Sequence, residues 1–94
     1  MTSQEKNGWK HFLKLCTQIK SVDELDQLFK LMLTIEEQET ISSRYLIIKA
    51  LLEATAPQRE ISEQLKVSIA QITRGSNALK IVNPQFKAAL KDLI

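Results

Sequence analysis

The sequence contains few of the residues that stabilise small domains covalently or through a metal ion. Among its 94 residues there is one cysteine, Cys16, so an intrachain disulfide is excluded. A structural zinc site needs about four Cys or His ligands at short spacings, and the chain offers only His11 and Cys16. A domain of this length buries a modest share of its surface, so its stability alone is marginal. The sequence therefore predicts one small domain that gains stability by oligomerisation.

Glycine, proline and long apolar runs are also scarce. Two glycines and two prolines are too few for the turns of a β-sandwich, whereas the helix formers Ala, Leu, Lys, Glu and Gln are abundant. The longest uninterrupted apolar run is Tyr45–Ile48, far short of the roughly 20 residues that cross a bilayer, and the N-terminus lacks the apolar core of a signal peptide. We expect an all-α fold and a cytoplasmic protein.

Residues suited to catalysis are equally rare. His11 and Cys16 lie five positions apart, about 140° around a helix, so they cannot form a local pair of nucleophile and base. We interpret His11 as a surface residue and Cys16 as a small buried apolar one. Gly8 and Gly75 are the only glycines, which excludes a P-loop and a dinucleotide-binding fingerprint. The sequence predicts neither an enzyme nor a metal or organic cofactor.

Apolar spacing and helix-start signals predict six helices joined by short links. Capping boxes are expected at Ser21–Glu24, Thr34–Glu37 and Ser68–Gln71. Pro57 lies near one helix start, and Pro84 follows the N-cap candidate Asn83 in another. The predicted helices cover residues 7–20, 22–32, 34 to about 54, 57–65, 68 to about 80, and 83–93.

Residues 58–80 have the outline of a helix-turn-helix, and the chain from Gln64 to Lys91 is basic. A short helix, a turn around residues 66–68 and a longer helix follow one another, and in such motifs the second helix enters the major groove of DNA. No acidic residue occurs between Gln64 and Lys91. A solvated face and a nucleic-acid surface both explain this charge bias. The basic residues in this segment are Lys66, Arg74, Lys80, Lys87 and Lys91.

Gly75 falls inside the longer of these two helices, where glycine costs about 1 kcal/mol relative to alanine. Two explanations are open at this point. A tight helix crossing is one, and close approach of a ligand or a phosphate to the backbone is the other.

The segments ITRGSNALK at residues 72–80, QRE at 58–60 and LMLT at 31–34 resemble the Trp repressor family, and the resemblance covers about residues 28–93. It implies an intertwined, all-α, six-helix homodimer. In it, about 1–54 and 83–94 form the dimerisation core and about 57–81 the DNA-reading head. It further implies a repressor of tryptophan biosynthesis or salvage genes that binds operator DNA when L-tryptophan, its corepressor, sets two reading helices roughly 34 Å apart.

By this resemblance, the corepressor is bound between the core and the reading head. Its indole would lie between the guanidinium planes of Arg44 and Arg74, and its carboxylate would pair with Arg74 and Thr34. Backbone carbonyls of Leu31 and Leu33 from the partner chain would accept from its ammonium group. From the residues alone, Thr34 is explained as a helix N-cap, the leucines as core and Arg44 as a surface residue. The implied site comprises Leu31, Leu33, Thr34, Arg44, Arg74 and Gly75.

The DNA contacts follow from the resemblance in the same way. Arg59 is best placed to reach a guanine edge, and most of the others would hold phosphates. The implied contacts are Gln58, Arg59, Ser68, Ile69, Ala70, Gln71, Thr73, Arg74, Ser76, Asn77 and Lys80.

The chain departs from the family pattern at four places. Ala78 replaces a serine that helps to bind the ligand's ammonium group, Gln71 replaces a threonine, Ser62 replaces a lysine, and Lys66–Ser68 replaces a glycine-rich turn. A repressor of the same fold that senses another indole or amino acid is therefore an alternative. A helical protein–protein dimerisation module is an alternative from another class, and salt dependence of binding would separate it from a DNA-binding protein.

Overall fold

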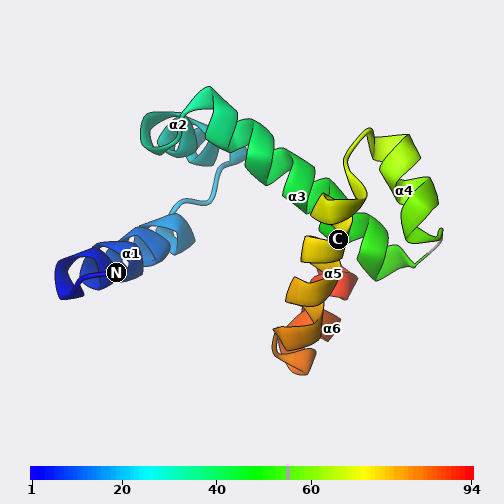
Figure 1. Cartoon of the computed structure of the whole chain (residues 1–94). Coiled ribbons are helices and arrows are strands. Elements are labelled where there is room, and N and C mark those ends of the chain that lie inside the picture. Colours follow the sequence, from blue (N-terminus) through cyan, green and yellow to red (C-terminus); the bar gives the residue numbers. More distant parts are fainter. Residues whose placement is uncertain (55) are drawn as a thin grey trace. The chain divides into compact units, whose positions relative to one another are not determined.

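The computed structural model describes residues 1–54 and 56–94, and all regular structure in that part of the chain is α-helical (Figure 1). The predicted fold class and the order of the helices are confirmed. The helices are α1 (Ser3–Gln18), α2 (Val22–Met32), α3 (Ile35–Glu53), α4 (Gln58–Leu65), α5 (Ile69–Ile81) and α6 (Pro84–Leu93).

The first helix begins earlier than predicted. The Thr2 hydroxyl accepts from the Glu5 N–H at 3.1 Å, and the Glu5 carboxylate accepts from the Thr2 N–H at 2.9 Å. This capping box starts the helix at Ser3, so the prediction of a start at residue 7 is wrong. The helix ends at Gln18, two residues before the predicted end at about residue 20, because the backbone is already extended at Ile19.

The other predicted helix starts are confirmed. At the start of α3 the Thr34 hydroxyl accepts from the Glu37 N–H at 3.1 Å, and the Glu37 carboxylate accepts from the Thr34 N–H at 2.8 Å. Ser21 accepts from the Glu24 N–H at 3.2 Å, which is one of the two bonds of the expected box. Asn83 caps α6, with Pro84 as its first residue.

The chain divides into two compact units, Met1–Gln38 and Glu39–Ile94. In the first unit, Phe12 stacks on Trp9 and on Phe29, with ring centroids 5.9 and 6.0 Å apart. Neither α1 nor α2 contains a buried residue. The predicted division into a dimerisation core and a reading head concerns the assembled dimer, and it stays a prediction.

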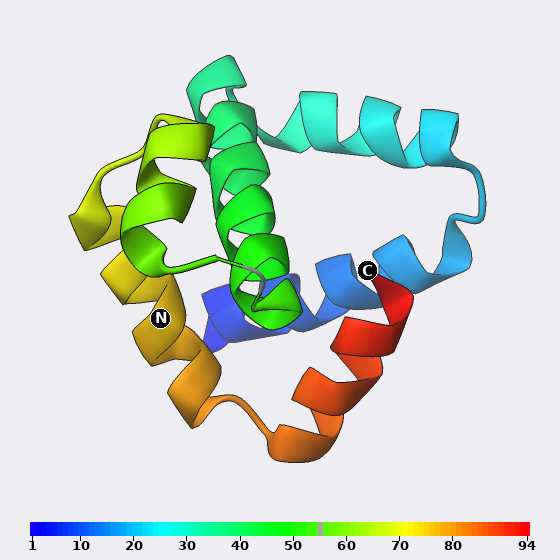
Figure 2. The same cartoon turned by 90° about the vertical axis from the view of Figure 1, so that its right-hand side faces the viewer.

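The second unit has an isoleucine core. Ile47 of α3, Ile61 of α4 and Ile72 of α5 form one buried cluster, and Ile72 has no exposed surface. Figure 2 shows the three helices that supply these residues. Half-buried residues from the same unit pack around the cluster, so α4 and α5 are attached to α3 by apolar burial. These residues are Ala50, Leu51, Ala56, Leu65 and Val67.

Gly75 lies where α5 crosses α3. A Cβ atom at this position would be 3.0 Å from Cγ2 of Ile47, 3.5 Å from Cδ1 of Leu51 and 3.6 Å from Cδ1 of Ile48. The first of these distances is shorter than a normal van der Waals contact. The tight helix crossing is thus sufficient to explain a glycine inside α5.

None of the described helices is both long enough and apolar enough to cross a bilayer.

Candidate nucleic-acid interface and ligand site

The segment from α4 to α5 has the predicted helix-turn-helix order, and its turn is closed by Ser62. The Val67 N–H donates to the Ser62 carbonyl at 3.2 Å, while the Ser62 hydroxyl donates to the Val67 carbonyl at 2.6 Å. Lys66, between them, has φ 56° and ψ 45°, the left-handed conformation that favours glycine. The two bonds between Ser62 and Val67 therefore hold a turn in which the left-handed conformation of Lys66 costs about 1–2 kcal/mol.

The role of Ser62 was not predicted from the sequence. Its hydroxyl bonds a carbonyl five residues further along the chain, a spacing that belongs to none of the usual capping patterns. A serine near the end of a short helix carries no signal for such a bond until the turn geometry is known.

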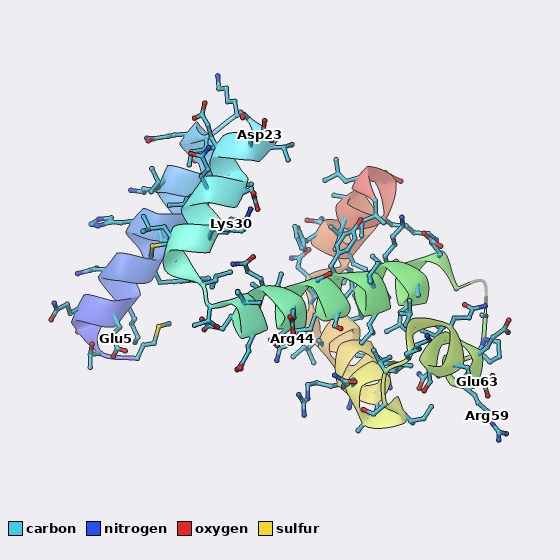
Figure 3. All side chains as sticks on the ribbon, turned by 90° about the horizontal axis from the view of Figure 1, so that it is seen from above. Glu5, Asp23, Lys30, Arg44, Arg59 and Glu63 are labelled. Carbon is cyan, nitrogen blue, oxygen red and sulfur yellow. The ribbon has the colours of Figure 1, made fainter. Side chains whose placement is uncertain are left out.

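The outer sides of α4 and α5 carry the residues that the family resemblance assigns to DNA. Figure 3 shows Arg59 on the side of α4 that faces away from α3. Ser76 is half-buried, and the remaining predicted contacts are exposed: Gln58, Arg59, Ser68, Ile69, Ala70, Gln71, Thr73, Arg74, Asn77 and Lys80. The structure thus brings all of them together on one helix-turn-helix of the second unit.

The N-terminus of α5 is the positive end of a helix dipole that no acidic side chain offsets. The first turns of α1, α2, α3 and α4 each contain Asp or Glu, whereas those of α5 and α6 contain none. Its capping box is formed by Ser68 and the uncharged Gln71, with both reciprocal bonds present. A helix start of this kind favours an approaching phosphate. The exposed Arg74 and Lys80 add positive charge along the same helix.

Residues 31–34, predicted to bind the ligand, lie where α2 ends and α3 begins. Leu31 is in the last turn of α2 and Leu33 is its C-cap, so their carbonyls are among those that lack a partner within the helix. Thr34 caps the N-terminus of α3. The segment therefore places a partially negative helix end next to a partially positive one, which suits a zwitterion. As a side chain, Leu31 is 81% exposed, so within this chain it is not a core residue.

The capping box at Thr34 also affects the charge of α3. The bond that Glu37 accepts from the Thr34 backbone, supported by the Thr34 hydroxyl, holds the pKa of the Glu37 carboxyl below its ordinary value. Glu37 thus stays ionised at the start of α3, where a negative charge is stabilised by the helix dipole.

Two arginines predicted to hold the indole ring lie in the second unit. Arg44 projects from α3 (Figure 3) and Arg74 belongs to α5, and both are exposed. Within residues 1–54 and 56–94, neither forms an ion pair with a carboxylate; the salt bridge there joins Lys30 and Asp26. Gly75 is explained by its packing on α3, and its role in ligand binding stays a prediction.

The remaining residues discussed from the sequence are His11, Cys16 and Ala78. His11 is exposed, as predicted, whereas Cys16, predicted to be buried, is only half-buried within this chain. Ala78 is exposed on α5 and offers no hydrogen-bonding group at its position. Over the described residues, the His, Cys, Asp and Glu side chains form no group that could hold a metal ion.

Comparison with known proteins extends over nearly the whole chain. The family model described as "Trp repressor protein" matches residues 7–94. A "Trp operon repressor homolog" from Chlamydia trachomatis serovar D is 53% identical over 91 residues, which are 97% of this chain and 97% of that protein. The protein of that name from Chlamydia caviae is 52% identical, covering 94% of this chain and 87% of its own length.

A more distant relative is also covered over most of its length. The "Trp operon repressor homolog" of Actinobacillus succinogenes is 38% identical over 93 residues, which are 98% of this chain and 91% of that protein. The match thus includes the helix-turn-helix, the α2–α3 junction and both arginines. The chain therefore belongs to the Trp repressor family, whose members are DNA-binding regulators of transcription and not enzymes.

Proposed function

We propose that this chain is an L-tryptophan-activated transcriptional repressor that acts in the cytoplasm as a homodimer on operator DNA. The genes it controls would be those of tryptophan biosynthesis or salvage, in keeping with the name "Trp operon repressor homolog" of its relatives. The observation that carries the proposal is the family match over residues 7–94, joined to a helix-turn-helix with an exposed polar and basic face.

In this proposal α5 is the recognition helix and α4 supports it. The uncharged first turn of α5 approaches the bases, while Arg74 and Lys80 neutralise phosphates. Arg59, on the outer side of α4, donates to a guanine edge. The buried Ile61 and Ile72 hold the two helices in the fixed relation that such reading requires.

L-tryptophan would bind at the helix ends described above. Its ammonium group would be held by the Leu31 and Leu33 carbonyls of the partner chain, and its carboxylate by Thr34 and Arg74. The Thr34 hydroxyl accepts from the Glu37 N–H, so its own proton is available to the carboxylate. The indole would stack between Arg44 and Arg74, for which planar guanidinium groups are suited and lysine is not.

A second copy of the chain would cover apolar surface that a single chain leaves in water. α1, α2 and α6 contain no buried residue. Val22, Leu31 and Leu93 are each more than four-fifths exposed, at 84%, 81% and 83%. Apolar exposure on this scale marks an interaction surface. A dimer also supplies two recognition helices for two half-sites of an operator.

Titration calorimetry tests whether the chain binds L-tryptophan, and sedimentation analysis of the same sample gives its oligomeric state. We expect one ligand per chain on a dimer. Arg74→Ala should abolish ligand and DNA binding and leave the dimer intact. Indole and a second aromatic amino acid serve as controls. Absence of heat from L-tryptophan in a folded dimer would contradict its role as the signal.

One departure favours a second candidate ligand. Ala78 lacks the hydroxyl that the family pattern places there, so the chain has one donor or acceptor fewer for an amino acid. A repressor of this fold that senses another indole or amino acid would give heat with that compound and none with L-tryptophan. Ala78→Ser should tighten binding of L-tryptophan or leave it unchanged, and strong weakening would contradict the assigned site.

DNA binding is tested by its salt dependence. Contacts to several phosphates release counterions, so the affinity for DNA should fall steeply as salt rises. Arg59→Ala should relax sequence preference without changing the affinity for L-tryptophan. A module that binds only protein through apolar surface would show neither effect.

A further inference from the structure

The carboxamide of Gln71, in the first turn of α5, is held in one orientation. Its Oε1 accepts from the Ser68 backbone N–H at 2.9 Å and lies 3.3 Å from the Ser68 hydroxyl. That hydroxyl in turn accepts from the Gln71 N–H at 3.1 Å. A backbone N–H can only donate, so the amide atom that faces Ser68 must be the oxygen. The reciprocal bonds therefore fix which end of the amide points outward.

The outward end is a hydrogen-bond donor. Oxygen and nitrogen diverge from the same carbon, so with Oε1 turned to the helix cap, Nε2 and its two N–H groups point away from Ser68. The Gln71 side chain is exposed. It belongs to the second helix of a helix-turn-helix, whose first residues meet base edges in the major groove. The Nε2 amide group of Gln71 is thus available to donate to DNA, whereas its Oε1 is already bonded to Ser68.

A donor alone reads a different base from a whole carboxamide. An unrestrained glutamine pairs with adenine, because its nitrogen donates to N7 while its oxygen accepts from N6. Guanine presents N7 and O6, two acceptors side by side. Resting on the operator binding proposed above, we infer that Gln71 is a specificity-determining residue that selects guanine over adenine at the base pair facing the start of α5.

Selection from a randomised duplex library tests this inference, using the full-length chain in the presence of L-tryptophan. We expect guanine to be enriched at one symmetry-related pair of positions, by about tenfold over the other bases. Gln71→Ala should remove the preference there and leave the preferences at other positions unchanged.

Gln71→Glu is the matched variant that keeps the fold of the cap. Glutamate forms the same capping box with Ser68, but its outward atom is an acceptor. The preferred base at that position should change from guanine to cytosine, whose N4 amino group donates. Gln71→Lys, which supplies donors only, should keep the preference for guanine. Circular dichroism melting checks that each variant is folded, and sedimentation analysis checks that it is a dimer.

Three results would overturn the inference while leaving operator binding in place. The first is a wild-type preference for adenine at the position that Gln71→Ala relaxes. The second is a loss of affinity in Gln71→Ala that is equal for all sequences, which indicates a phosphate contact. The third is that Gln71→Ala and Gln71→Glu keep the base preferences of the wild type. If the wild-type dimer enriches no sequence at all, the proposed repressor function fails, and the assignment of Gln71 fails with it.

Discussion

The two units of the chain differ in how much apolar surface they bury. The buried residues of the described chain, Ile47, Leu52, Ile61 and Ile72, all belong to residues 39–94. Residues 1–38 contain none, although their helices have clear apolar stripes. Short helices in water are held mainly by packing of such stripes. The second unit therefore supports its own helix-turn-helix, whereas the first is the part that a second chain must complete in the proposed dimer.

The largest expected effect is on the core of the second unit. Leu52 is 5% exposed, so Leu52→Ala should lower the free energy of unfolding by about 2–5 kcal/mol. The loss should be the same at all protein concentrations, because the contacts lie within one chain. Urea unfolding followed by circular dichroism measures it.

Leu31→Ala is the matched control in the first unit, where the same atoms are deleted from a side chain that is 81% exposed. This change should make the melting temperature depend more strongly on protein concentration, because it weakens the association of the two chains. A concentration-independent loss as large as that of Leu52→Ala would refute the contrast between the units.

Gly75→Ala should destabilise the second unit by about 1–2 kcal/mol. The added Cβ would lie 3.0 Å from Cγ2 of Ile47, which is 2% exposed and has no room to move. This cost exceeds the gain in helix propensity. Ile47→Ala in the same chain removes the clashing methyl, so the two changes together should cost less than the sum of each alone. Strict additivity in thermal unfolding would show that the crossing is not tight.

Lys66→Gly should stabilise the second unit by about 1 kcal/mol, since glycine adopts the left-handed conformation at φ 56° without steric cost. Lys66→Ala separates this effect from the loss of charge, because alanine keeps the strain. If both variants change the stability equally, the backbone of the turn is not strained. Chemical denaturation of the three proteins is the measurement.

The smallest effect is expected from pH in the first unit. The pKa of Glu37 is lowered by the bonds from Thr34, so its contribution to stability is full above the ordinary carboxyl pKa. It is lost as the pH falls through the lowered value. Glu37→Gln should therefore weaken the dependence of the melting temperature on pH on the acidic side. Gln38→Glu, one residue along, should not reproduce that effect, and equal behaviour of both variants would contradict the role of the capping box.

Local signals in the sequence predicted most of the fold. The capping boxes at Thr34 and Ser68 and the Asn83–Pro84 start are formed by neighbouring residues, and each lies where it was expected. The Thr2–Glu5 box has the same pattern, and applying that rule there would have corrected the start of α1. Family motifs located the residues assigned to DNA, and the structure brings these residues together on α4 and α5.

Spacing and composition were thus enough to establish an all-α chain with a helix-turn-helix, because helix starts and apolar stripes depend on residues a few positions apart. Three features were established only by the folded chain. The contacts of Gly75 with α3 explain why a glycine stands inside α5. The bond between Ser62 and Val67 closes the turn of the helix-turn-helix. Residues 1–38 have no core because one chain cannot bury their apolar surface.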